Sequence, residues 1–198
     1  MKKKLILNIL FYIFVIYIAG YILFSAFLPH KVIDIFGFQA FNVETPSMTG
    51  KLNVNDVTIS TKIKNEDSLK VGDIITFQAI PSDLTRKIVI THYIAKIEII
   101  DGEKVFITQD RNNFVQQTEN YDQWYEMVDG EKVEKAIEFS DILGRHTLRI
   151  PKVGIVIAFV QNILFDPVFI ILITVNLVII YAIIKIILKK EPPKETEK

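Results

Sequence analysis

Two long hydrophobic runs flank a segment in which short apolar runs alternate with polar turns. The first run covers residues 5–28, and the second covers residues 168–188 with a single charge, Lys185. At about 1.5 Å of helix per residue, the first run would be roughly 36 Å long, enough to cross a hydrocarbon core of about 30 Å. Both runs therefore predict membrane-spanning helices.

The segment between the two runs has the pattern of β-strands. Strand-like runs, β-branched or alternating with period two, occur at residues 57–63, 74–77, 87–100, 104–108 and 137–150, the last interrupted at Gly144. Asp101-Gly102 between two of these runs is a strong hairpin signal. We therefore predict a mainly β fold, a small antiparallel β domain between two transmembrane helices.

Two stretches of the β domain do not read as strands. Residues 112–135 are polar and predict a long loop or a ragged hairpin, while residues 150–165 predict a short helix or an interfacial segment. The aromatic residues Tyr121, Trp124 and Tyr125 fit either an interfacial belt or a packed loop.

Four parts are predicted along the chain. Residues 1–28 form an anchor and residues 29–165 a β-rich domain. Residues 166–188 form a second helix, and residues 189–198 a disordered tail.

Lysines at both ends predict the orientation in the membrane. They precede the first run and follow the second: Lys2, Lys3, Lys4, Lys189, Lys190 and Lys194. The positive-inside rule places both termini in the cytoplasm of a multi-pass cell-membrane protein and residues 29–165 outside. The first run is much longer than the roughly 7–15 apolar residues of a cleaved signal, which favours an uncleaved anchor.

Composition excludes several classes of function. A formal net charge of zero argues against a nucleic-acid partner, which normally needs a basic face. The lack of cysteine excludes disulfides, cysteine metal sites and cysteine nucleophiles such as that of a sortase. The chain has no glycine-rich phosphate loop and no ligand-spaced histidine cluster, so we expect no metal, nucleotide or organic cofactor.

One serine and three histidines offer candidate chemistry. Ser47 follows Pro46 about twenty residues after the first hydrophobic run, and a serine hydroxyl needs a base to become a good nucleophile. His92 lies in a β-branched run and is one candidate base, with His146 as the fallback. His30 follows the first run directly and is interpreted as an interfacial residue.

Five short boxes of residues follow one another along the chain. They cover residues 46–48, 69–77, 91–94, 106–113 and 144–154. In content and order these boxes resemble those of type I signal peptidases, specifically the archaeal and endoplasmic-reticulum-type branch. The first resembles the family's Ser-Met box, the second its Gly-Asp strand and the third its Thr-His box. The resemblance runs from the anchor to about residue 160.

The resemblance implies that Ser47 is the nucleophile and His92 its general base. Lys87 is close in sequence but lacks the context of the lysine that serves as base in the other branch. The family's Gly-Asp step is absent here, and Asp110 is favoured over Asp122 as the acid that orients His92.

The resemblance implies a membrane-bound serine endopeptidase that removes signal peptides from secreted precursors. Its implied partners are signal-peptide-bearing precursors, the lipid bilayer and the secretion translocon. Two alternatives stay open. The altered Gly-Asp step is compatible with a non-catalytic homologue that binds precursors or assembles with a membrane protein, and the sequence also fits a peptidase dedicated to a few substrates.

Overall fold

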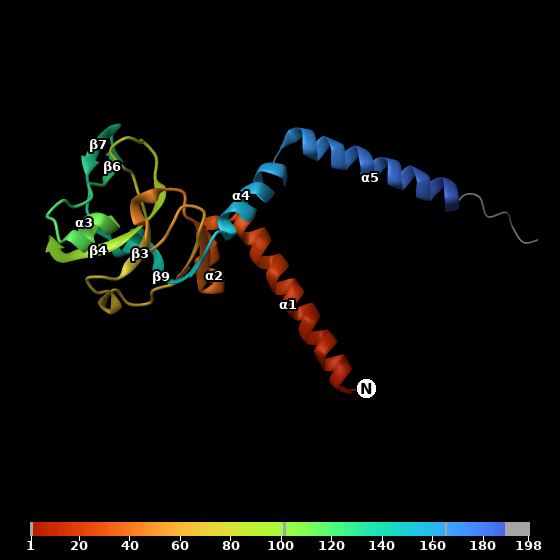
Figure 1. Cartoon of the computed structure of the whole chain (residues 1–198), viewed down its shortest axis with the longest axis horizontal. Helices are drawn as coiled ribbons and strands as arrows, with labels where there is room; N and C mark the ends of the chain where they lie inside the picture. The colour runs from red at the N-terminus through yellow and green to blue at the C-terminus, as the bar shows by residue number, and fades with distance from the viewer. Residues whose placement is uncertain (1, 101, 165, 189–198) are drawn as a thin grey trace, which may run out of the picture. The chain divides into compact units, whose positions relative to one another are not determined.

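A seven-stranded antiparallel sheet forms the centre of the fold. The computed structural model describes residues 2–100, 102–164 and 166–188. The strands of the sheet follow the order β1-β2-β9-β3-β4-β5-β8. They are β1 (Phe38–Asn42), β2 (Val57–Thr61), β3 (Ile74–Ala79), β4 (Ile88–Ile100), β5 (Glu103–Gln109), β8 (Ile137–Glu138) and β9 (Ile142–Ile150). A separate hairpin pairs β6 (Tyr125–Val128) with β7 (Glu131–Glu134) (Figure 1).

Helices precede, interrupt and follow the strands. The α-helices are α1 (Lys2–Phe27), α2 (Val32–Phe36), α3 (Arg111–Gln116), α4 (Val153–Leu164) and α5 (Pro167–Leu188). Four short 3-10 helices are η1 (Pro29–Lys31), η2 (Pro46–Met48), η3 (Glu66–Ser68) and η4 (Phe139–Asp141). Both α1 and α5 are long and apolar enough to cross a membrane. The predicted fold class, mainly antiparallel β with an apolar helix toward each end, is confirmed.

The chain divides into two compact units, the first ending at Gly154 and the second beginning at Ile155. The first unit holds the whole sheet, and the second holds most of α4 and all of α5. The predicted disordered tail, residues 189–198, lies outside the described residues.

The core of the sheet lies around β3, its central strand. Ile75 and Phe77 of β3 are fully buried, and they pack with Ile94 of β4 and Phe106 of β5. Each of these side chains contributes roughly 1.5–3 kcal/mol by leaving water. The β4–β5 hairpin closes where the sequence predicted, because Ile100 pairs directly with Glu103.

The predicted interruption of the last strand at Gly144 is wrong. The break falls at η4 (Phe139–Asp141), and β9 continues through Gly144. A Cβ at this position would lie 2.6 Å from the Thr61 carbonyl oxygen and 2.7 Å from Cδ1 of Ile33. Gly144 therefore keeps the strand continuous where a neighbouring backbone comes close.

Three further segments complete the comparison with the sequence. The edge strand β1 has no counterpart among the predicted strand runs. The polar stretch 112–135 holds most of α3 and the β6–β7 hairpin, which fits the ragged-hairpin interpretation. Residues 153–164 form the short helix α4, one of the two alternatives predicted there.

An aromatic cluster joins α1 to the first edge of the sheet. Tyr21 of α1 stacks on Phe38 of β1 with ring centroids 5.3 Å apart and meets Phe36 of α2 edge to face at 5.2 Å. Its hydroxyl also accepts a hydrogen bond from the Ala40 backbone N–H at 3.0 Å. This bond satisfies an outward-facing donor of an edge strand, a group that otherwise needs water.

Candidate active site

Ser47 lies in the 3-10 turn η2, whose geometry begins with proline. Pro46 fixes its own φ, and its carbonyl accepts hydrogen bonds from the Thr49 backbone N–H at 2.9 Å and hydroxyl at 2.7 Å. Met48 is buried, whereas the neighbouring Ser47 side chain is partly exposed. The Ser47 hydroxyl oxygen lies 3.3 Å from the hydroxyl oxygen of Thr45.

A hydrogen-bond network holds the segment after η2. Gly50 has φ of +94°, and its N–H donates to the Asn53 side chain at 2.9 Å. The Asn53 N–H donates in turn to the Asp56 carboxylate at 2.7 Å. This carboxylate also accepts a hydrogen bond from the Lys152 N–H at 3.1 Å and forms an ion pair with Arg149 at 2.6 Å. Burial alone would raise the pKa of the Asp56 carboxyl, but these N–H donors and the guanidinium outweigh burial and lower the pKa. The ionised Asp56 carboxylate thus holds the segment after η2 in place through these bonds.

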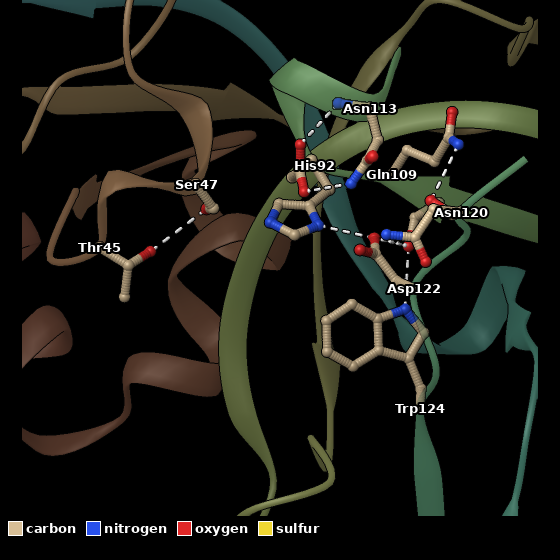
Figure 2. Close-up of polar contacts among 10 residues, drawn as sticks. Thr45, Ser47, His92, Gln109, Asn113, Asn120, Asp122 and Trp124 are labelled. Atoms are coloured by element: carbon tan, nitrogen blue, oxygen red, sulfur yellow. Dashed lines mark hydrogen bonds and ion pairs between the residues drawn. The ribbon is translucent and has the colours of Figure 1, made fainter. Parts of the chain in front are cut away.

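His92 lies on β4, opposite Ile75 of β3, and its side chain is only 8% exposed. Its neighbour Tyr93 packs against the small core cluster of Met48, Leu52 and Ile74, so β4 abuts η2. Figure 2 shows the imidazole edge that does not face Asp122 turned toward the side of Ser47.

Asp122 is the acid that His92 contacts. Its Oδ2 lies 2.7 Å from Nδ1 of His92, and its side chain is 15% exposed (Figure 2). The same oxygen accepts a hydrogen bond from the Thr108 hydroxyl at 2.7 Å. The Trp124 indole N–H donates to the Thr108 hydroxyl at 2.9 Å, and the indole ring lies 5.9 Å from the His92 ring, centroid to centroid.

The loop that carries Asp122 is tied back to β5. The buried Gln109 amide donates to the carbonyl oxygens of Thr118 and Asn120, at 2.9 and 3.0 Å. The Asp122 N–H then donates to the backbone carbonyl of Thr108 at 3.0 Å. These bonds bring residue 122 beside β5 although it lies twelve positions after Asp110 in the sequence.

Asp110, the acid favoured from the sequence, has a different position. It is the N-cap of α3, where its carboxylate accepts hydrogen bonds from the Asn113 backbone N–H at 2.9 Å and side-chain amide at 2.7 Å. An aspartate that opens a helix satisfies N–H groups that have no partner within the helix. The structure therefore corrects the preferred partner of His92 from Asp110 to Asp122.

The other candidate bases contact groups elsewhere. His146 on β9 places Nδ1 2.6 Å from the Thr58 hydroxyl, and burial, then the nearby Lys51 ammonium, lower the pKa of its imidazole. The Lys87 ammonium lies 3.2 Å from the carboxylate of Asp141.

Helix α3 connects the serine turn with the histidine strand. Arg111 donates to the Thr49 carbonyl at 3.1 Å, and Phe114 stacks on Tyr93 with ring centroids 4.4 Å apart. No local sequence pattern indicated these contacts or the hydrogen bonds of Thr108. For Trp124 it offered a packed loop as one of two interpretations, and the ring does pack, against Phe77 at 5.5 Å.

This arrangement suits nucleophilic chemistry on a carbonyl. A carboxylate can only accept hydrogen bonds when ionised, so its contact with Nδ1 selects the histidine tautomer that carries a proton there. The second nitrogen, Nε2, is then free to take a proton from a hydroxyl. A serine, a histidine and a partly buried carboxylate are the groups that a general-base mechanism requires.

Comparison with known proteins assigns the family. A model of the signal peptidase family, peptidase S26, matches residues 10–160. The matched span includes most of α1, the whole sheet, and Ser47, His92 and Asp122. The comparison with curated protein sequences gives no match. The resemblance to type I signal peptidases is confirmed at the level of the family, while the branch stays a prediction: the chain belongs to the signal peptidase family S26, a family of serine peptidases.

Proposed function

We propose that this protein is a membrane-bound endopeptidase of the Ser/His type that cleaves signal peptides from secreted precursors. The observation that carries the proposal is the 2.7 Å contact between Nδ1 of His92 and the Asp122 carboxylate. His92 lies on β4, and this strand abuts the turn that carries Ser47. Membership of a serine peptidase family supports the same chemistry.

Ser47, His92 and Asp122 have distinct roles in the proposed reaction. Nε2 of His92 takes the Ser47 hydroxyl proton as the oxygen attacks the scissile carbonyl carbon. Asp122 holds Nδ1–H and stabilises the imidazolium that results. The imidazolium then donates its Nε2 proton to the leaving amine, which leaves the signal peptide as an ester on Ser47. His92 then takes a proton from water as its oxygen attacks the ester carbonyl, and the imidazolium returns that proton to the Ser47 oxygen as the ester bond breaks and the signal peptide leaves with a free carboxylate.

Groups around η2 can stabilise the oxyanion of the tetrahedral intermediate. The Ser47 and Met48 N–H groups open a 3-10 turn, where backbone donors have no partner inside the helix. The Thr45 hydroxyl lies 3.3 Å from the nucleophilic oxygen. We assign these donors to the oxyanion hole, in which each donor typically contributes about 2.7–4 kcal/mol.

The substrate and its membrane location follow from the two apolar helices. The signal helix would lie in the bilayer beside α1, with its cleavage segment extended along a strand edge at the outer membrane face. Lysines at both chain ends support a cytoplasmic location of the termini. Sharing one membrane raises the effective concentration of enzyme and precursor. The proposed partners are therefore precursors, the bilayer and the translocon that delivers the precursors.

Replacement of the nucleophile tests the proposal. The full chain, reconstituted in lipid vesicles with a signal-peptide-bearing precursor, should release the mature protein. Ser47→Ala should slow this release by at least about a thousandfold. Ser68→Ala is the matched control, because Ser68 lies in η3, where its hydroxyl donates only to the nearby Asn65 carbonyl at 2.7 Å.

Two results would overturn the proposal. Full processing by Ser47→Ala would remove Ser47 from the reaction. Binding of the precursor without any cleavage by the parent chain would favour the non-catalytic alternative.

A further inference from the structure

We propose that Thr108 and Trp124 are positioning residues of this peptidase, which act through Asp122 to hold the His92 imidazole in its reactive tautomer. The inference rests on the proposed function. Neither residue touches the substrate in the proposed mechanism, and neither lies next to Ser47, His92 or Asp122 along the chain.

Four side chains form one continuous hydrogen-bonded chain. The Trp124 N–H lies 2.9 Å from the Thr108 hydroxyl oxygen, which lies 2.7 Å from Oδ2 of Asp122. The same Oδ2 lies 2.7 Å from Nδ1 of His92. The members come from β5, from the segment between α3 and β6, and from β4 (Figure 2).

The chemistry of these groups sets the direction of the chain. An indole N–H can only donate, so Trp124 occupies a lone pair of the Thr108 oxygen. The single Thr108 hydroxyl hydrogen is then directed to Asp122. Two donors, the Thr108 O–H and the His92 Nδ1–H, thus converge on one carboxylate oxygen, which can only accept from both of them. With Nδ1 protonated, Nε2 keeps the lone pair that must accept the serine proton.

Burial makes the loss of a hydrogen bond in this four-residue network costly. Thr108 is 1% exposed and the His92 side chain is 8% exposed, so water cannot easily replace a lost partner. A buried polar group left without a partner lowers stability by more free energy than a hydrogen bond contributes on balance. The Trp124 ring also lies against both Phe77 and His92, which fixes the position from which its N–H donates.

Kinetics of the reconstituted full chain provide the first test, with a peptide that carries an apolar segment and an Ala-x-Ala cleavage site. Thr108→Val should lower kcat roughly tenfold with KM nearly unchanged, and Trp124→Phe about threefold. Thr108→Ser keeps the hydroxyl and should restore kcat. The double variant should be no slower than Thr108→Val alone, because Trp124 acts only through Thr108. Tyr125→Phe is the matched control at the next residue, the first of β6, and should leave kcat unchanged.

Nuclear magnetic resonance of the ring nitrogens of His92 gives a readout that does not depend on cleavage. The chain has three histidines, so labelling with ¹⁵N-histidine and a His92→Gln variant assigns the signals. At about pH 8.5, well above the ordinary imidazole pKa of about 6.5, the Nδ1-protonated tautomer should dominate in the Ser47→Ala chain. Adding Thr108→Val should move the Nδ1 proton upfield, and adding Trp124→Phe should move it less in the same direction.

Two outcomes would overturn the inference. One is an unchanged His92 spectrum in both variants. The other is a double variant whose loss of kcat equals the product of the two single losses, which is expected if Trp124 contributes only packing. Cleavage that persists in Ser47→Ala would instead contradict the proposed function and leave the spectroscopic result readable.

Discussion

His92 and His146 are both held through Nδ1, but their partners differ in charge. Asp122 offers His92 a carboxylate oxygen 2.7 Å from Nδ1, which accepts the ring proton at that nitrogen. Thr58 offers His146 only a hydroxyl at 2.6 Å, while burial and then Lys51 lower the pKa of His146. The environment of His92 suits a group that gains and returns a proton, whereas that of His146 favours the neutral imidazole.

The lowered pKa of His146 predicts a pH dependence of stability. Protonation of His146 favours the unfolded chain, where its pKa is about 6.5. The contribution of the neutral His146 imidazole to the free energy of unfolding is complete above about pH 6.5. It is lost as the pH falls through the pKa of His146 in the folded chain, which is lower. Between about pH 7.5 and pH 5, the free energy of unfolding should therefore fall further in the parent than in His146→Gln. Urea unfolding in micelles, followed by the fluorescence of the single tryptophan, measures this difference, and equal pH dependence would contradict it.

Single residues show where sequence reasoning was sufficient and where it was not. Ser47 and His92 were proposed from boxes of adjacent residues; the structure places them on η2 and β4, which abut, and their roles in catalysis stay predictions. Asp122 was the less favoured alternative, because its contact with His92 depends on how the segment after α3 folds back on β5. Asp110 matched the box better, yet its carboxylate meets the first turn of α3. Such long-range contacts leave no local pattern.

At the scale of elements, α3 acts as a bridge. Its first residue, Arg111, reaches the Thr49 carbonyl beyond the serine turn, and Phe114 stacks on the strand that carries His92. A Cβ on Gly50 would lie 2.9 Å from the Arg111 guanidinium, so the glycine leaves room for this contact. We infer that α3 fixes the separation of the serine turn and the histidine strand.

Removal of the arginine contact should loosen the serine turn. Arg111→Gln should lower kcat/KM about three- to tenfold and speed amide hydrogen exchange in residues 46–52. The reason is that a well-formed charge-assisted hydrogen bond contributes roughly 1.5–3 kcal/mol, and an exposed one contributes less. Arg86→Gln removes an equal charge from an exposed loop position and should change neither quantity. Faster exchange in both variants would point to a general charge effect.

Strand patterns made most of the elements predictable, and two exceptions have physical reasons. β1 is an edge strand that pairs on one side with β2 and meets α1 aromatic residues, so its burial is not alternating. Gly144 was read as a break because glycine is rare in strands, but here it admits the Thr61 carbonyl. Both depend on neighbours from distant parts of the chain.

At the scale of the molecule, the joint between α1 and the sheet links the proposed membrane anchor to the sheet that carries the candidate site. Tyr21 combines ring contacts with Phe36 and Phe38 and a hydrogen bond from Ala40. A stiff joint would hold the Ser47 turn at a set height above the membrane. The length of the apolar segment of a signal peptide would then decide which bond reaches the site.

Weakening this joint should relax the length requirement. For peptides with progressively longer apolar segments, the parent's cleavage rate should depend steeply on length, and Tyr21→Ala should flatten this dependence. Tyr21→Phe keeps the stacking and should have an intermediate effect. Tyr12→Ala removes a tyrosine that is 64% exposed on the same helix and should behave as the parent. An unchanged length dependence in Tyr21→Ala would show that the joint does not set the height.

The identity of the acid beside His92 is the central feature of the proposed mechanism. Single-turnover cleavage of a signal-peptide precursor by two matched variants, Asp122→Asn and Asp110→Asn, tests it directly. Asp122→Asn should slow cleavage about 10³- to 10⁴-fold, because an amide permits the wrong histidine tautomer. Asp110→Asn should stay within about threefold of the parent, because asparagine caps a helix as well as aspartate does. The reverse order of the two rates would contradict the account.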